Sequence, residues 1–163
     1  RMSRKQVSTP LIISLGSNQG DRSANLDLAV QLLEQNFVMK GQSRVYESRA
    51  VDYTDQPNFY NQLLEFVLPA MPQENILKIV LNIENKMGRR RGIPKGPRNI
   101  DIDLIFAGIM PFKGPDLVLP HPRLFDRSFI VIPLRELPSY PLLCKIYDFP
   151  QSFPYEMSLQ MIR

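Results

Sequence analysis

Two aspartates alternate with isoleucines in the segment GPRNIDIDLIFAG, residues 96–108. Asp101 and Asp103 are two positions apart, so in a β-strand they project from the same face, roughly 7 Å apart at about 3.3 Å per residue. Two neighbouring carboxylates repel unless a proton or a cation lies between them. Mg²⁺ suits this position because it takes one or two carboxylates and completes its shell with water and phosphates. The pair predicts a metal site, and a solvated polar strand face is the alternative.

A concentrated positive charge precedes this strand. Residues 86–98, KMGRRRGIPKGPR, hold six basic side chains and no acidic one, whereas the net charge of the whole chain is +4. One loop is therefore basic, and the rest of the chain is not. Arginine forks fit the non-bridging oxygens of a triphosphate, so the candidate phosphate ligands are Arg89, Arg91, Lys95 and Arg98. A solvated charge run and a nucleic-acid contact are the alternatives.

Two further segments combine aromatic and polar side chains. In DQPNFYNQ, residues 55–62, Phe59 can stack on a flat heterocycle while Asn61 pairs with its edge through donor and acceptor together. For that segment alone, a core aromatic and a turn asparagine are the better interpretation. The segment LPHPRLFDRSF, residues 119–129, contains His121, the only histidine of the chain. In the same segment, Arg127 is a candidate phosphate ligand and Phe129 could stack on the second face of a heterocycle. A lone histidine is more often structural than catalytic.

The order of helices and strands determines where these residues lie. Apolar patterns predict strands over 10–17, 40–48, 61–69 and 99–108, and helices over 20–36 and 72–88. This β-α-β-β-α-β order is the ferredoxin-like arrangement, an α+β fold with an antiparallel sheet and helices on one face. The proline-rich remainder predicts a C-terminal extension with a short helix near 126–137.

Neighbouring positions refine this prediction. Ile100, Ile102 and Leu104 are expected to face the helices, which leaves the two aspartates on the open face. Asp21 or Ser23 is expected to cap the first helix. The segment SLGSNQGDR, residues 14–22, lacks the spacing of a phosphate-binding P-loop and predicts only a strand-to-helix turn.

Length and composition fit a single globular domain. The chain has 163 residues, 44% of them hydrophobic, and no apolar run approaches the roughly 20 residues of a membrane span. Its single cysteine, Cys144, excludes an internal disulfide. We expect one domain over 1–163, with 1–9 and about 150–163 peripheral, in the cytoplasm.

Together these segments resemble the 6-hydroxymethyl-7,8-dihydropterin pyrophosphokinase family of folate biosynthesis. The resemblance covers about residues 10–140, and the pattern GPRxxDxDL is close to a signature of the family. It implies a ferredoxin-like fold, ATP as co-substrate, two Mg²⁺ ions, and transfer of pyrophosphate from ATP to the pterin with release of AMP. The implied partners are small molecules, with no nucleic acid and no membrane. Fusion to another folate-pathway enzyme is a further expectation.

The resemblance also implies a role for each candidate residue. Asp101 and Asp103 would hold the metals, and Arg89 and Arg91 would be catalytic arginines that close on the triphosphate. The nucleotide would be bound by Glu84, Arg98, Leu104, His121 and Arg127. The pterin would be bound by Ser48, Val51, Phe59, Asn61 and Phe129. We expect the acids and bases to form two halves of one Mg-ATP site, rather than mutual ion pairs.

Three positions depart from the family pattern. SRAVDY, residues 48–53, replaces a frequent Thr-Pro segment, Pro94–Lys95 stands where an aromatic is common, and Pro122 stands where an aromatic can follow His121. These departures affect the pterin-side loop, a lid over the pterin and the contact with adenosine. A nucleic-acid-binding module and a structural partner-binding domain are the rival functions from other classes.

Overall fold

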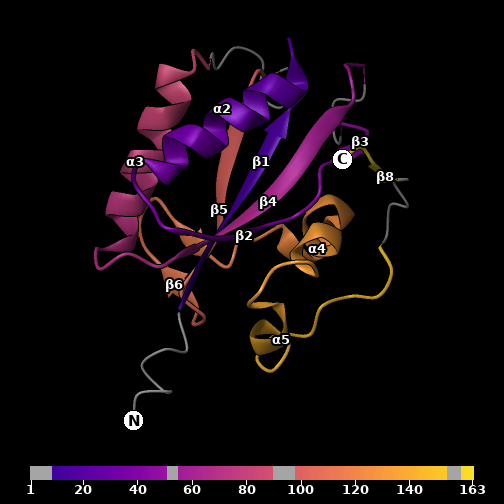
Figure 1. The fold of residues 1–163 in the computed structure, drawn as a ribbon. Helices are drawn as coiled ribbons and strands as arrows, with labels where there is room; N and C mark the ends of the chain where they lie inside the picture. Colours follow the sequence, from indigo (N-terminus) through magenta and orange to yellow (C-terminus); the bar gives the residue numbers. More distant parts are fainter. Residues whose placement is uncertain (1–8, 51–54, 90–97, 154–158) are drawn as a thin grey trace.

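The computed structural model describes residues 9–50, 55–89, 98–153 and 159–163 (Figure 1). Its main sheet has the strand order β5-β1-β4-β3-β8, and β2 also pairs with β4. The strands of this sheet are β1 (Pro10–Ser17), β2 (Met39–Gln42), β3 (Tyr46–Ser48), β4 (Phe59–Val67), β5 (Asp101–Ala107) and β8 (Gln160–Met161). The helices are α2 (Arg22–Glu34), α3 (Gln73–Lys86), α4 (Ser128–Leu134) and α5 (Tyr140–Leu143). A small hairpin, β6 (Phe112–Lys113) with β7 (Val118–Leu119), and a 3₁₀ turn, η1 (Leu124–Asp126), complete the list.

The predicted ferredoxin-like order is confirmed. β2 and β3 both pair with β4, so the central sheet runs β5, β1, β4 and then β2 with β3, and every pairing is antiparallel. α2 follows β1, and α3 connects β4 to β5. The chain therefore follows the βαββαβ path, to which the short edge strand β8 is added beside β3.

The two predicted helices form, with ends set by identifiable residues. The Asp21 side chain caps α2 by accepting a hydrogen bond from the backbone N–H of Ala24, so Ser23 lies inside the helix. Pro72 immediately precedes α3, and Gly88 beyond its end has φ of 77°, a left-handed value that favours glycine. Because the chain turns at Gly88, the following residue, Arg89, does not continue α3.

Two strand predictions need correction. The strand expected over 61–69 is β4, Phe59–Val67, and it ends earlier because Pro69 has no N–H with which to extend the ladder. The single strand expected over 40–48 is divided into β2 and β3. The division arises at Ser43, whose Oγ accepts the N–H of Leu63 at 2.9 Å in place of a backbone carbonyl.

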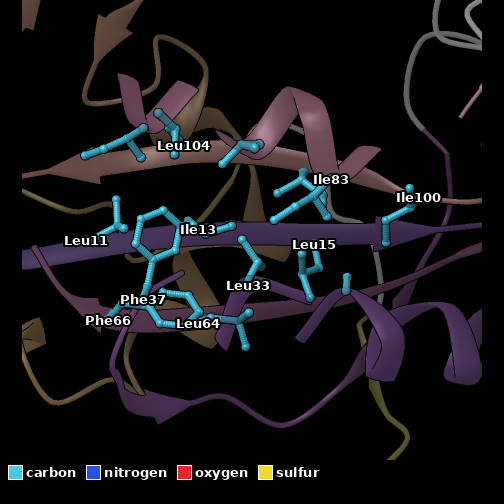
Figure 2. Packing of buried hydrophobic residues seen from close by; sticks show 14 of the residues in the cluster. Leu11, Ile13, Leu15, Leu33, Phe37, Leu64, Phe66, Ile83, Ile100 and Leu104 are labelled. Carbon is cyan, nitrogen blue, oxygen red and sulfur yellow. The ribbon is translucent and has the colours of Figure 1, made fainter. Parts of the chain in front are cut away.

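Apolar side chains form one cluster on each face of the sheet. The first, between the sheet and helices α2 and α3, contains Ile100, Ile102 and Leu104, as expected. Figure 2 shows this cluster around β1, with side chains labelled Leu11, Ile13, Leu15, Leu33, Phe37, Leu64, Phe66, Ile83, Ile100 and Leu104. The second cluster joins Ile12, Leu63 and Ile105 to residues of α4, α5 and their connections.

The C-terminal extension therefore covers the face opposite α2 and α3 (Figure 1). The helix expected near 126–137 is α4, preceded by η1. This extension covers β5 at Ile105, so the face that carries the aspartates is open only toward the Asp101 end of the strand. None of the helices in the described ranges is long and apolar enough to cross a lipid bilayer.

Candidate active site

A pocket of about 240 Å³ lies at the uncovered end of the sheet. Strands β1, β3, β4 and β5 form its floor, and the segment from His121 to Ile130 forms its wall. It is lined by Ser14, Leu15, Gly16, Ser48, Arg49, Phe59, Asn61, Arg98, Asp101, Asp103, His121, Arg127, Phe129 and Ile130. The structure thus brings together residues from four strands and one long connection.

A second cavity of about 350 Å³ lies on the α3 side of the same carboxylates. Its wall is apolar where Leu77, Leu81, Leu117 and Val118 contribute. Its other lining residues are Glu84, Arg89, Asp101, Ile102, Asp103, Leu104, Asp116, His121 and Pro122. Asp101, Asp103 and His121 line both cavities, so the aspartates stand between two pockets of different character.

Gly16 of β1 lies between the Phe59 ring and the carboxylates. It is paired with Asn61 on one side and Asp101 on the other. A Cβ atom added there would lie 3.4 Å from the Phe59 ring and 3.9 Å from Cβ of Asp101, which are ordinary van der Waals contacts. The Phe59 ring therefore packs directly over β1, next to the acidic pair.

The two aspartates have different electrostatic surroundings. Asp101 forms ion pairs with Arg89 and Arg98, each with a nitrogen–oxygen distance of 3.6 Å. Burial, and then the negative charges of Asp101 and Glu84, raise the pKa of Asp103 to about 7, although the positive charges of Arg127 and Arg89 lower it. Asp103 is therefore the carboxylate whose ionisation most needs an added cation.

The ion pairs of Asp101 correct the expectation that acids and bases would not pair with each other. Arg98 lies three residues before Asp101, and the turn at Gly88 directs Arg89 toward the start of β5. The same guanidinium of Arg89 lies 3.3 Å from Glu84. The Nε atom of Arg89 is buried and has no hydrogen-bond partner among the described residues.

The carboxylates fit a divalent cation. Oxygen ligands are those that Mg²⁺ prefers, and it commonly takes only one or two carboxylates from the protein. Within the described ranges, no group of three or more histidine, cysteine, aspartate or glutamate side chains could hold a metal. Asp101 and Asp103 would therefore provide two protein ligands, and phosphate oxygens and water would provide the rest.

Glu84, on α3, is a buried carboxylate that contacts both β5 and Arg89. Its side chain is 2% exposed, and its Oε2 accepts the backbone N–H of Ile102 at 2.7 Å. The same carboxylate accepts hydrogen bonds from Arg89. Glu84 was predicted to bind nucleotide; although it lines the second cavity, its described contacts position β5 and Arg89.

His121 lies where the two cavities meet. Its Nδ1 accepts the backbone N–H of Arg123 at 3.1 Å. Burial lowers the pKa of this imidazole, and the positive charge of Arg127 lowers it further. A neutral ring whose Nδ1 is an acceptor carries its proton on Nε2, which makes that atom a hydrogen-bond donor.

An amide and two aromatic side chains line the first pocket on the β4 side. Asn61 is 3% exposed, and its Nδ2 donates to Oγ of Ser48 at 2.8 Å and to the carbonyl of Tyr46 at 3.1 Å. Its Oδ1 accepts no hydrogen bond from the described residues. Phe59 and Phe129 line the same pocket, each near an arginine: Arg98 lies 5.4 Å from the Phe59 ring centre and Arg127 lies 5.6 Å from that of Phe129.

The pockets thus contain all predicted site residues that the structure describes, while Arg91, Lys95 and Val51 lie outside the described residues. The lining residues that the sequence interpretation missed include four that are polar or glycine: Ser14, Gly16, Arg49 and Asp116. The same interpretation gave no role to Asn18, which is buried at the edge of the site. Three of these five residues, Ser14, Gly16 and Asn18, belong to the segment SLGSNQGDR. This segment was compared only with the spacing of a P-loop and so was assigned no role in the site.

Comparisons with known proteins agree with the geometry. The family described as 7,8-dihydro-6-hydroxymethylpterin-pyrophosphokinase (HPPK) matches residues 12–139. A 2-amino-4-hydroxy-6-hydroxymethyldihydropteridine pyrophosphokinase of Bacillus subtilis is 38% identical over 127 residues, 77% of this chain and 75% of that protein. The protein of the same name from Aquifex aeolicus is 38% identical over 125 residues, with coverage of 77% and 78%.

Longer proteins match over part of their length. The chain is 39% identical to the mitochondrial folate synthesis bifunctional protein of Arabidopsis thaliana, and it spans only 23% of that protein. A crystal structure described as HPPK-DHPS in complex with substrates has a TM-score of 0.62 and 13% identity, covering 79% of this chain and 40% of that one. At that identity, the structural likeness shows the fold alone.

Proposed function

The chain belongs to the 7,8-dihydro-6-hydroxymethylpterin-pyrophosphokinase family, and we propose that it transfers pyrophosphate from ATP to 6-hydroxymethyl-7,8-dihydropterin. One observation carries the proposal: Asp101, Asp103 and His121 line two adjacent cavities of different composition. A reaction between two bound substrates needs this arrangement, because the reacting atoms must meet at the shared wall.

The first pocket takes the pterin. Phe59 and Phe129 stack on the two faces of the heterocycle, and Oδ1 of Asn61 accepts a ring N–H because its Nδ2 is already bonded to Ser48. The predicted Val51 contact rests on the family resemblance. The second cavity takes the nucleotide, with adenine against its apolar wall and the phosphates toward Asp101 and Arg89.

The hydroxymethyl oxygen of the pterin attacks the β-phosphorus of ATP. A bond forms between that oxygen and the β-phosphorus, and the bond from the β-phosphorus to the oxygen bridging the α-phosphate breaks. AMP leaves with the bridging oxygen, and the hydroxyl proton passes to solvent. Positioning and charge neutralisation provide most of the rate in phosphoryl transfers of this kind.

The basic residues neutralise the developing charge. Arg89 and Arg98 exchange Asp101 for phosphate oxygens, and Nε2 of His121 donates a hydrogen bond, while Arg127 adds a further positive charge. Arg91 is proposed to close on the triphosphate with Arg89. Asp101 and Asp103 would hold two Mg²⁺ ions, which when bound neutralise phosphate charge and lower the pKa of the substrate hydroxyl.

The assay for this function measures both products. The protein is incubated with ATP, Mg²⁺ and the pterin, and AMP and pterin diphosphate are quantified by chromatography. We expect the two products in equal amounts, with no AMP when the pterin is omitted or EDTA is added. Formation of ADP and a pterin monophosphate, or no pterin product, would contradict the proposal.

A cytoplasmic location and one domain over residues 1–163 are further parts of the proposal.

A further inference from the structure

Asn18 lies in the turn between β1 and α2, and it is 1% exposed. Its Nδ2 donates to Oε1 of Gln56 at 2.8 Å and to the carbonyl of Pro57 at 3.0 Å. Its Oδ1 accepts the backbone N–H of Arg98 at 2.8 Å, and its backbone N–H donates to the carbonyl of Arg98 at 3.0 Å. One buried amide therefore joins three segments that are far apart in the chain.

The loops of Gln56–Pro57 and of Arg98, joined by this amide, both lead to the first pocket, and Arg98 also reaches Asp101, which lines both cavities. The segment of Gln56 and Pro57 enters β4 at Phe59, which lines the first pocket. Arg98 forms an ion pair with Asp101, and its guanidinium lies 5.4 Å from the centre of the Phe59 ring. A shift of either segment therefore changes the relative position of the aromatic wall and the phosphate-binding arginine.

The turn that carries Asn18 is fixed to α2. Nδ2 of Asn25, in the first turn of α2, donates to Oγ of Ser17 at 3.1 Å and to the carbonyl of Gln19 at 2.9 Å. Water cannot easily replace the bonds of Asn18, because the side chain is buried and both ends of its amide are in use. The turn is thus a fixed support. Asn18 holds the loop of Gln56 and Pro57 to it through its side chain, and it holds Arg98 through both its side chain and its backbone N–H.

We infer that Asn18 is a positioning residue that couples the pterin pocket to the nucleotide pocket. The inference rests on the proposed function for the identity of the two ligands. Binding of either ligand orders its own segment, and Asn18 transmits that order to the other. Coupling between two sites is reciprocal, so each ligand must strengthen the other by the same factor.

The test is a binding cycle by isothermal titration calorimetry. The pterin and the Mg²⁺ complex of an α,β-methylene analogue of ATP, which cannot react, are titrated singly and each in the presence of the other. In the wild-type protein we expect each ligand to lower the Kd of the other by one common factor. In Asn18→Ala we expect that factor to fall about fivefold or more, toward one, while the Kd of each ligand alone changes less.

Two variants separate coupling from a general loss of structure. Asn18→Asp keeps the acceptor for the N–H of Arg98 but loses the donors to Gln56 and Pro57, so it should also lose the coupling; it decides the test if Asn18→Ala does not fold. Asn36→Ala removes an amide that bonds only the carbonyl of Leu32 among the described residues, at the far end of α2 from both loops, and it should keep the wild-type factor.

The outcomes are distinct. An unchanged coupling factor in Asn18→Ala and Asn18→Asp, or a wild-type factor of one, overturns the role of Asn18 while leaving the proposed function intact. A wild-type protein that binds neither ligand overturns the proposed function, and the coupling with it.

Discussion

The carboxylates of Asp101 and Asp103 lie two residues apart on one face of β5, but they differ in their ion pairs and in their electrostatic surroundings. Asp101 is 25% exposed and pairs with Arg89 and Arg98. Asp103 has a pKa raised to about 7, first by burial and then by its acidic neighbours. A divalent cation at this pair would therefore change the protonation of Asp103 most.

Asp101→Asn and Asp103→Asn should each lower kcat for AMP formation by at least about 100-fold, because each removes one of two protein ligands for the metal. Circular dichroism should show that both variants remain folded. Asp126→Asn is the control, since Asp126 is 57% exposed and pairs only with Arg123 among the described residues. A variant of either β5 aspartate with wild-type kcat would contradict the metal assignment.

His121 offers a direct measurement, because it is the only histidine in the chain. Its Cε1 proton resonance should titrate with a midpoint below 6.5, since burial and then Arg127 lower its pKa. The unfolded chain then binds this proton at a higher pH than the native state, so the free energy of unfolding should rise with pH from the native pKa up to about 6.5.

Two variants check the causes of this shift. Arg127→Gln should raise the midpoint by removing a nearby positive charge, whereas Arg135→Gln, a more distant arginine not among the causes of the shift, should leave it unchanged. A midpoint at or above 6.5 in the wild-type protein would show that the imidazole is not held neutral.

At the scale of elements, polar contacts, some buried and some exposed, hold α4 and α5 to the sheet. Glu65 on β4 is 0% exposed, and its carboxylate accepts the backbone N–H of Ser139 at 2.9 Å and its hydroxyl at 2.5 Å. Glu136 accepts hydrogen bonds from the N–H of Arg44 and the hydroxyl of Tyr46. These contacts fix the extension whose first residues carry Arg127 and Phe129 into the site.

Glu65→Ala should lower the free energy of unfolding by about 3 kcal/mol, because it leaves the polar groups of Ser139 buried without their partner. Glu65→Gln should cost about 1 kcal/mol, because the amide keeps one acceptor. Urea unfolding measures both, with Glu34→Ala, on the exposed face of α2, as a control expected to change stability by less than about 0.5 kcal/mol. A Glu65→Ala variant as stable as the control would show that the contact does not hold the extension.

At the scale of the whole molecule, the central strand β1, like β4 and β5, contributes side chains to both apolar clusters. Ile13 belongs to the cluster under α2 and α3, and its neighbour Ile12 belongs to the cluster under α4 and α5; both are 0% exposed. Loss of either cluster therefore weakens the packing of the same central strand.

Ile12→Ala and Ile13→Ala should each lower the free energy of unfolding by about 3 kcal/mol, and each should do so in a single transition. Far-UV circular dichroism follows the backbone of the whole fold, and tyrosine fluorescence follows side-chain packing through six tyrosines, of which Tyr140 and Tyr147 pack against the second cluster. We expect the two signals to coincide. Separate midpoints would contradict the proposed single domain.

The sequence by itself determined the path of the chain and the acidic face of β5. Helical and strand periodicities are local, so the βαββαβ order and the burial of Ile100, Ile102 and Leu104 could be predicted from neighbouring residues. Arg98, Asp101 and Asp103 lie within six residues, so their proximity was also a local property. The break at Ser43 was not predicted, because it depends on a hydrogen bond with another strand. The early end of β4 was also missed, although its cause, Pro69, is visible in the sequence.

Only the tertiary structure decided how these parts form one site. It placed the extension on the second face of the sheet, paired Asp101 with Arg89, and brought Asn18 to Arg98, 80 positions away. It also showed that Nδ2 of Asn61 donates to Ser48 and Tyr46, while its Oδ1 accepts no hydrogen bond from the residues that the structure describes. The physical reason is that strand order and register fix which distant side chains meet, and neither is encoded in the spacing of residues along one segment.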